Sequence, residues 1–109
     1  MSEQTSSVEE GLREIVELDR LIHEPARMII MAILYVADAD FLFLLRQTGL
    51  TKGNLSSHLT KLEQAEYIVI EKTFVGKTTR TVCRLTDTGH QAFRSYRERL
   101  RRAVESLPE

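Results

Sequence analysis

The sequence predicts a small, mostly α-helical domain that carries one β-hairpin. Its 109 residues correspond to about one domain. Most of its apolar residues recur at the three- and four-residue steps of helices, and only residues 67–85 show the β-branched and aromatic pattern of strands. Apolar residues make up 42% and charged residues 28%, as in folded globular proteins. We therefore expect one folded unit over residues 8–107, preceded by a disordered tail over residues 1–7.

Several protein classes are excluded by composition. The single cysteine cannot close a disulfide within the chain, so a disulfide-stapled secreted scaffold is ruled out. The longest apolar run, over residues 28–37, is too short to span a bilayer. The first ten residues are polar and acidic, unlike a signal peptide. We expect a cytoplasmic protein without a membrane partner.

The charges are distributed unevenly along the chain. Residues 1–45 hold three arginines and nine acidic residues, whereas residues 46–102 hold twelve lysines or arginines and five acidic residues. A basic half on a nearly neutral chain is typical of proteins that bind a polyanion. Five of these arginines fall on one late helix, where an ordinary solvated surface would explain them equally well.

Two helices are expected before residue 38. Apolar residues at helical spacing predict a helix over Val8–Ile22. Pro25 ends this pattern and suits the first turn of a following helix. That helix, over residues 26–37, is apolar nearly all round, which predicts a central core position.

Residues 40–65 have the pattern of two helices joined by a tight turn. Asp38 or Asp40 can cap a short helix that ends at Gly49, where a left-handed backbone is allowed. Thr51 can cap the next helix, which extends to Ala65. Its leucines lie at i, i+4 and i+7 and predict one buried stripe, while the residues between them are small and polar. This arrangement is a helix-turn-helix.

A β-ribbon directly after such a helix forms a wing. The expected strands cover residues 67–73 and 80–85 and flank a tip over residues 74–79. Two strands alone are marginally stable, so the ribbon must pack on the helices. Lys77 and Arg80 bracket the tip and suit the backbone or the minor groove of DNA.

The second helix of the helix-turn-helix and the wing supply the expected DNA contacts. Small residues let a helix approach the floor of the major groove, asparagine can pair with adenine, hydroxyls can bond base edges and lysines can bind phosphates. The expected DNA-binding residues are Thr51, Lys52, Gly53, Asn54, Ser56, Ser57, Thr60, Lys61, Lys77, Thr78, Thr79 and Arg80.

The terminal helices predict a homodimer. A last helix over residues 87–107 and the first helix each carry an apolar stripe, and leaving both stripes in water would exceed the stability margin of a small domain. The two helices could instead pack on each other within one chain. The residues expected at a dimer interface are Leu12, Ile15, Leu18, Ile22, Phe93, Tyr96, Leu100, Val104 and Leu107.

These segments resemble winged helix-turn-helix transcriptional regulators of the MarR and ArsR kind, and most of all the short MarR-like winged-helix DNA-binding domains. The resemblance covers residues 18–93 and is carried by His-Glu-Pro-Ala-Arg at 23–27, Gly-Leu-Thr-Lys-Gly-Asn-Leu-Ser-Ser-His-Leu at 49–59, Lys-Leu-Glu at 61–63 and Leu-Thr-Asp-Thr-Gly at 85–89. It implies a homodimer that binds double-stranded DNA at a pseudo-palindromic operator, usually as a repressor.

Other functions have weaker support in the sequence. The chain has no phosphate loop, nucleotide fingerprint or paired carboxylates, so we expect no enzyme and no cofactor. His23, His58, His90 and Cys83 lack the spacing of metal ligands. Cys83 is expected to be a small buried residue and His58 to link two helices. A winged helix used as a protein-interaction module remains the alternative, and a small-molecule effector is possible without support from any polar cluster.

Overall fold

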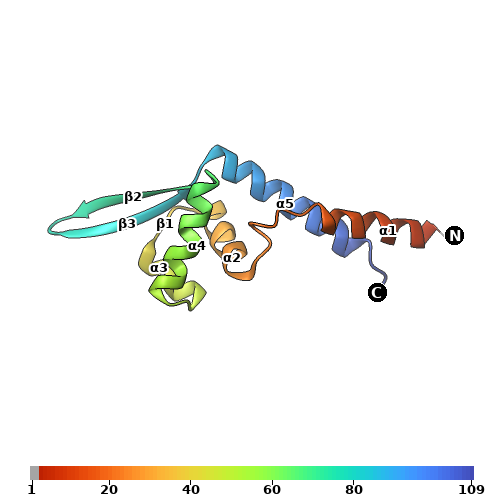
Figure 1. Cartoon of the computed structure of the whole chain (residues 1–109), viewed down its shortest axis with the longest axis horizontal. Coiled ribbons are helices and arrows are strands. Elements are labelled where there is room, and N and C mark those ends of the chain that lie inside the picture. Colours follow the sequence, from red (N-terminus) through yellow and green to blue (C-terminus); the bar gives the residue numbers. More distant parts are fainter. Residues whose placement is uncertain (1–2) are drawn as a thin grey trace.

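The structure, a computed structural model, describes residues 3–109, with side chains from Ser6 onward. It consists of helices and a three-stranded antiparallel sheet with strand order β1-β3-β2, which confirms a mostly helical fold with a small hairpin (Figure 1). The elements are α1 Glu3–Val16, α2 Pro25–Val36, β1 Ala39–Asp40, α3 Phe41–Thr48, α4 Lys52–Gln64, β2 Ile68–Val75, β3 Thr78–Leu85 and α5 Asp87–Glu105.

Local caps set the ends of α3 and α4 as expected. The Asp40 carboxylate accepts a hydrogen bond of 2.8 Å from the backbone N–H of Phe43 and begins α3. Gly49 ends α3 in the left-handed region at φ 69°, which favours glycine because it has no Cβ. The Thr51 hydroxyl accepts from the N–H of Asn54 at 3.1 Å and begins α4. Because these contacts join residues close together in the chain, the turn could be predicted from the sequence.

The leucine stripe of α4 lies in the centre of the core. Leu55, Leu59 and Leu62 are 0, 2 and 0% exposed. They belong to one cluster with Ile30 of α2 and Ile68 of β2. Burial of each such side chain contributes roughly 1.5–3 kcal/mol to folding. The stripe therefore fixes the rotation of α4 about its own axis.

The hairpin is longer and tighter than the sequence predicted. The expected six-residue tip over residues 74–79 is wrong, because β2 and β3 pair up to Val75 and Thr78 and leave a two-residue loop. Gly76 has φ 65° and permits this sharp reversal. The two-residue strand β1, which the sequence did not predict, pairs with β3 and ties the hairpin to the start of α3.

Helices α1 and α5 lie side by side, antiparallel, and form an arm that extends away from the rest of the fold (Figure 1). Their packing is close, since a Cβ at Gly11 would lie 1.8 Å from the hydroxyl oxygen of Ser106. Glu14 pairs with Arg99 at 3.0 Å and with Arg102 at 3.4 Å across the two helices. The molecule measures 67 × 26 × 20 Å, with the arm and the hairpin at its two ends.

The predicted first helix is placed wrongly at both ends. It begins at Glu3, so residues 3–7 of the expected disordered tail are helical, whereas residues 1–2 lie outside the described residues. It ends at Val16 instead of Ile22 because the Asp19 carboxylate accepts hydrogen bonds from the backbone N–H groups of Leu21 and Ile22 and holds a turn there. Such a carboxylate-held turn competes with a continuous helix.

Four residues of the predicted dimer interface belong to the core of the chain. Leu18, Ile22, Phe93 and Tyr96 are only 4, 0, 7 and 2% exposed and pack in the central cluster. The apolar spacing predicts one continuous stripe along the terminal helices, but the body of the same chain covers the inner part of that stripe. Residues buried in this way cannot contact a partner, so their assignment to a dimer interface is wrong.

Replacement of Gly89 by alanine should destabilise the fold. A Cβ at this position, in the first turn of α5, would lie 2.0 Å from the backbone oxygen of Tyr67. The backbone would have to shift, and overpacking of this kind reduces the free energy of unfolding by about 1–3 kcal/mol. Urea unfolding followed by circular dichroism measures the change. Gly53→Ala is the matched control, because a Cβ there meets nothing within 4 Å; equal midpoints for the wild type and Gly89→Ala would contradict the packing described.

Candidate DNA interface

One side of α4 is exposed along the whole helix. The core holds its leucines, so the residues between them face solvent. No acidic residue occurs between Thr51 and Leu62, and the first acidic residue of α4, Glu63, lies in its last turn. The predicted contact residues of this helix are all exposed: Thr51, Lys52, Gly53, Asn54, Ser56, Ser57, Thr60 and Lys61.

A glycine in the first turn of α4 has no role in packing. A Cβ at Gly53 would point into open space, with no heavy atom within 4 Å. Its backbone is helical, so no positive φ requires glycine there. Glycine inside a helix is less stable than alanine by up to about 1 kcal/mol. Packing within the described residues therefore gives no reason for a glycine at this position.

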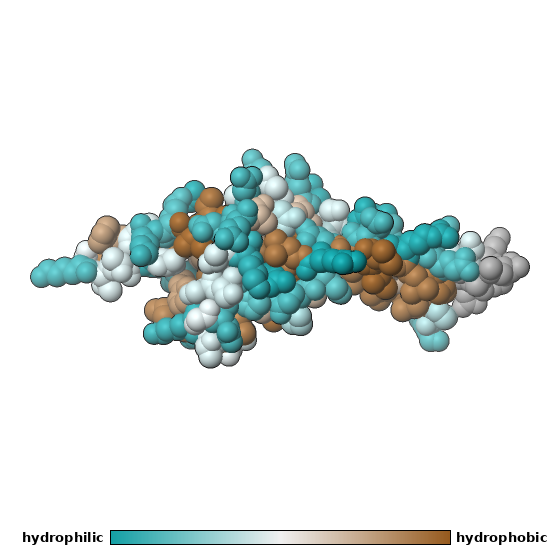
Figure 2. Space-filling view, in the orientation of Figure 1, coloured by the Kyte–Doolittle hydropathy of each residue, from teal (hydrophilic) through white to brown (hydrophobic). Residues whose placement is uncertain are grey.

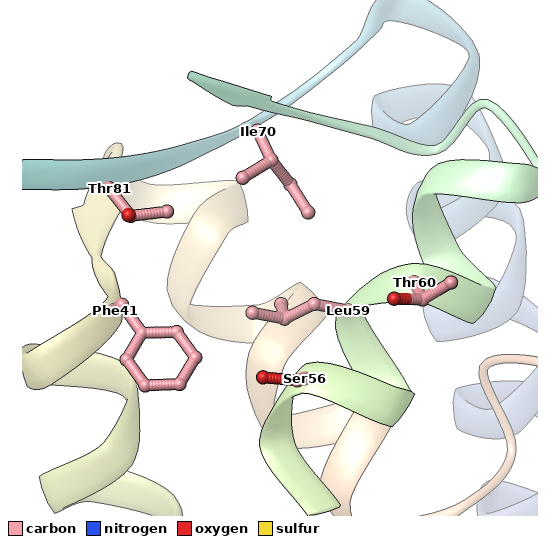
Figure 3. Close-up of a pocket in the computed structure, with 6 residues that line it drawn as sticks. All are labelled: Phe41, Ser56, Leu59, Thr60, Ile70 and Thr81. Atoms are coloured by element: carbon pink, nitrogen blue, oxygen red, sulfur yellow. The ribbon is translucent and has the colours of Figure 1, made fainter. Parts of the chain in front are cut away.

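A groove separates α4 from the base of the hairpin. It has a volume of about 310 Å³, and Figure 3 shows Leu59 of α4 on one side of it with Ile70 and Phe41 around it. The hydroxyl-bearing residues Ser56, Thr60 and Thr81 also line it. Two of the predicted contact residues, Ser56 and Thr60, thus lie on the hairpin side of α4, in a groove that residues of the ribbon also line.

His58 fastens α4 to α2, as the sequence predicted. The Arg27 guanidinium donates to Nδ1 of His58 at 3.0 Å, so that nitrogen accepts. Glu24 completes the cluster, with its carboxylate 3.7 Å from His58 and its oxygens capping α2. Burial raises the pKa of Glu24, but the backbone N–H groups of Arg27 and Ala26 and the nearby charges of His58 and Arg27 outweigh this and hold it below its ordinary value. The helix is therefore held by polar as well as apolar contacts.

The cations of the hairpin fall into two groups. Arg80 pairs with Asp40 at 2.9 Å and Arg84 pairs with Glu71 at 2.6 Å. The backbone N–H of Phe43, with help from Arg80, holds the pKa of the Asp40 carboxyl below its ordinary value. Lys72 and Lys77, by contrast, have no carboxylate within 4.0 Å among residues 6–109.

The hairpin tip places the remaining predicted residues in solvent, beside two exposed apolar residues. Lys77, Thr78, Thr79 and Arg80 are all exposed, although Arg80 is held by its internal partner. Phe74 and Val75 are 77 and 59% exposed, immediately before the turn. Two apolar residues next to the turn glycine are visible in the sequence. Their exposure is not, because apolar strand residues normally lie on the buried face of a sheet.

The arm carries a second exposed surface, which is apolar. Figure 2 shows hydrophobic groups gathered where α1 and α5 lie together. Five large apolar side chains on or next to these helices are 43–70% exposed: Leu12, Ile15, Val16, Val104 and Leu107. Leu12, Ile15, Val104 and Leu107 were predicted at a dimer interface, and Leu100 of the same prediction is half-buried on α5.

A smaller cavity of about 250 Å³ lies where the arm joins the body. Its polar lining includes Asp19, Tyr67, Ser95 and Arg99. The Tyr67 hydroxyl donates to Asp19, and burial with this contact raises the pKa of Tyr67 to about 12. No buried side-chain oxygen or nitrogen of the described residues lacks a hydrogen-bond partner. The sequence predicted no polar cluster here, and within this cluster Tyr67 is paired with Asp19 and Arg99 with Glu14.

Cys83 is a buried strand residue, as expected. It is 0% exposed, and burial, together with the charges of Glu63 and Asp40, raises the pKa of its thiol to about 11. In the part of the chain that the structure describes, no three His, Cys, Asp or Glu residues are arranged to hold a metal ion. Nor does any helix of residues 3–109 have the length and apolar character needed to cross a bilayer.

The chain is similar to known proteins of one family. The model of the winged helix DNA-binding domain family matches residues 26–104. An uncharacterized protein of Methanocaldococcus jannaschii is 31% identical over 78 residues, which cover 71% of this chain and 85% of that protein.

Solved structures agree with the family match. A transcriptional regulator homologue of Pyrococcus horikoshii OT3 superposes with a TM-score of 0.82 at 29% identity, covering 92% of this chain and 99% of that one. A protein of M. tuberculosis shares the fold, with a TM-score of 0.66 at 22% identity and coverage of 86% and 93%. The resemblance to winged helix-turn-helix regulators is confirmed, and the chain belongs to the winged helix DNA-binding domain family.

Proposed function

We propose that this protein is a transcriptional regulator that binds double-stranded DNA sequence-specifically, as a homodimer on a pseudo-palindromic operator, and that it represses transcription. The observation that carries this proposal is the exposed side of α4. From Thr51 to Leu62 it is small, polar and free of acidic residues. It adjoins a ribbon whose lysines, Lys72 and Lys77, have no carboxylate partner among the described side chains. Both features suit a polyanion with grooves.

The shape of α4 suits the major groove. This groove is about 12 Å wide in B-DNA and admits a helix, provided that the side chains facing its floor are short. Gly53 and Ser57 meet that condition, and Gly53 has no packing reason to lack a side chain. Asn54 can pair with adenine through its amide. Lys52 and Lys61 extend far enough to bind the phosphates on either side.

The hairpin suits the role of a wing beside that groove. Lys77 at its tip is exposed and has no carboxylate partner among the described residues, so its charge is available to a phosphate. Thr78 and Thr79 can add hydroxyl contacts. The Arg80–Asp40 pair joins the wing to the cap of α3. Arg80 therefore contributes more to the position of the wing than to DNA affinity.

The arm supports the homodimer. Its exposed apolar side chains extend beyond the winged body, on the two helices that a minimal winged helix does not need. A two-fold pair of arms would bury them. Such a dimer presents two α4 helices to successive major grooves, with half-sites about 34–36 Å apart. A protein that covers two half-sites of a promoter blocks access by RNA polymerase, which is the basis for proposing repression.

Selection of bound duplexes from a random library tests the proposal most broadly. We expect the purified chain to enrich one motif with two inverted half-sites, spaced by a whole helical turn. If its exposed surfaces serve only protein contacts, no sequence will be enriched and random duplex will not shift in a gel even at low salt. That result would overturn the proposal in favour of a protein-interaction module.

The two kinds of DNA contact should separate in mutants. Asn54→Ala should relax base preference at one position, with a loss of about 1–3 kcal/mol on the selected operator and little on other sequences. Lys77→Ala should weaken binding to all sequences alike and reduce the slope of log affinity against log salt by about 1. Fluorescence anisotropy with operator variants at several salt concentrations measures both effects.

Gln64→Ala is the control for the asparagine variant, since it removes an exposed amide at the far end of the same helix. Identical behaviour of Asn54→Ala and Lys77→Ala across operator variants would show that the roles are assigned wrongly.

Addition of a methyl group at Gly53 should have opposite effects on folding and on binding. Gly53→Ala should raise the free energy of unfolding by up to about 1 kcal/mol, because alanine favours the helix and meets no neighbour. The same methyl group should hold α4 away from the groove floor and weaken operator binding. Chemical denaturation and anisotropy on the same preparation provide the test, and binding that strengthens in step with stability would refute the close approach.

Charges placed on the arm should separate the dimer. Val16→Glu and Val104→Glu introduce carboxylates at positions 70 and 61% exposed in the single chain, so folding should persist while the shared apolar surface is lost. Sedimentation equilibrium should show a shift from twice the 12.5 kDa chain mass to that mass. Val36→Glu, at an 85% exposed site at the end of α2, is the matched control. A wild-type protein that sediments as a monomer at micromolar concentration would exclude the homodimer.

A further inference from the structure

The wing ends in an aromatic side chain that its own fold leaves uncovered. Phe74 is 77% exposed, although it lies in a paired strand one residue from the end of β2. Single exposed apolar residues are common on protein surfaces, so exposure alone decides nothing. The role of Phe74 therefore depends on where it lies relative to α4 and to Lys72 and Lys77.

Phe74 lies on the face of the ribbon that is turned toward α4. Side chains alternate between the two faces of a strand, so Ile70, Lys72 and Phe74 share one face. Ile70 lines the groove beside α4 together with Leu59 and Thr60. The cross-strand partners of Lys72 and Phe74 are Thr81 and Thr79, so this face continues as lysine, phenylalanine and threonine without an acidic residue.

The opposite face of the ribbon has a different character. It carries Glu71, Arg80 and Arg84, and both arginines are neutralised by carboxylates, from Asp40 and Glu71. The two faces are therefore electrostatically unequal. Only the α4 side presents a cation, Lys72, that has no carboxylate within 4.0 Å in the described chain, and Lys77 adds another at the tip.

The reach of the ribbon matches the spacing of DNA grooves. Phe74 is four residues from Ile70, which corresponds to roughly 13 Å along a strand. Neighbouring major and minor grooves lie about half a helical turn, or roughly 17 Å, apart. With α4 in a major groove, the end of the wing therefore arrives at the adjacent minor groove. The two-residue loop at Gly76 ends the ribbon abruptly, so that a single side chain such as Phe74 can extend from the tip into a groove about 6 Å wide.

We propose, on the basis of the DNA-binding function above, that Phe74 enters the minor groove beside the α4 site and inserts its ring at a base step. Lys72 and Lys77 hold the phosphates on either side of it. Insertion of an apolar side chain unstacks a step and kinks the duplex toward the major groove. The protein thus prefers a deformable pyrimidine–purine step under the wing, a preference that requires no hydrogen bond to a base.

The test compares variants of the two neighbouring apolar residues of the tip. Phe74→Ser removes the ring, Phe74→Leu retains an apolar wedge, and Val75→Ser is the matched control from the opposite face of the same strand. The duplex is the one selected from the random library, with fluorophores at its ends for bending and 2-aminopurine at the flanking step for unstacking. Circular dichroism and thermal unfolding confirm that each variant is folded.

The wild type should bend the duplex and raise 2-aminopurine fluorescence. Phe74→Ser should lose both signals and lose the preference for a pyrimidine–purine step. It should also bind about tenfold more weakly, a loss of about 1.4 kcal/mol, because the buried apolar ring is removed. Phe74→Leu should keep most of the bend. Val75→Ser should change affinity by less than about threefold.

Four results would overturn the inference, and they lead to three different conclusions. If the wild type binds its operator without bending or unstacking, or if Phe74→Ser behaves like Val75→Ser, the wedge is absent while the DNA-binding function stands. If Phe74→Ser changes the sedimentation of the protein without DNA, the ring is a protein contact instead. If the wild type binds no duplex, the inference falls together with the proposed function.

Discussion

Burial of the leucine stripe of α4 is the constraint on which the rest of the structure depends. Leu55, Leu59 and Leu62 are almost completely inaccessible, so α4 cannot rotate without exposing them. The cluster of Glu24, Arg27 and His58 secures the same helix from the side. With its orientation fixed, α4 presents a constant set of small and polar residues outward. A recognition surface needs this kind of rigidity, because base contacts depend on geometry within a fraction of an ångström.

Some charged side chains on the surface are paired with a partner of opposite charge, and others are not. The Asp40 and Glu71 carboxylates engage Arg80 and Arg84, so those arginines stabilise the wing and its junction with α3. Lys72 and Lys77 of the wing, by contrast, have no carboxylate within 4.0 Å among residues 6–109. Along the arm, Glu14 joins α1 to α5 through Arg99 and Arg102. The near-zero net charge thus conceals a basic region at the α4 and wing end and internally paired charges in the arm.

The elements that were predictable from the sequence are those with local signals. Asp40, Gly49 and Thr51 specify the ends of α3 and α4 through contacts within a few residues, and the exposed side of α4 follows from its leucines. Tertiary contacts decided the rest. Leu18 and Ile22 have helical spacing but lie in the segment after α1, where Asp19 holds a turn, and both are buried in the core. The length of the wing was also hidden, because a strand exposed on both faces has no burial pattern to reveal it.

The central claim is that α4 reads the major groove while the wing occupies the minor groove beside it. Dimethyl sulfate footprinting of the selected duplex reports on both, because guanine N7 lies in the major groove and adenine N3 in the minor groove. The account predicts protection of guanine N7 in two tracts one helical turn apart, with altered adenine N3 reactivity immediately outside each tract. Tight binding that leaves guanine N7 fully reactive in both tracts would contradict it.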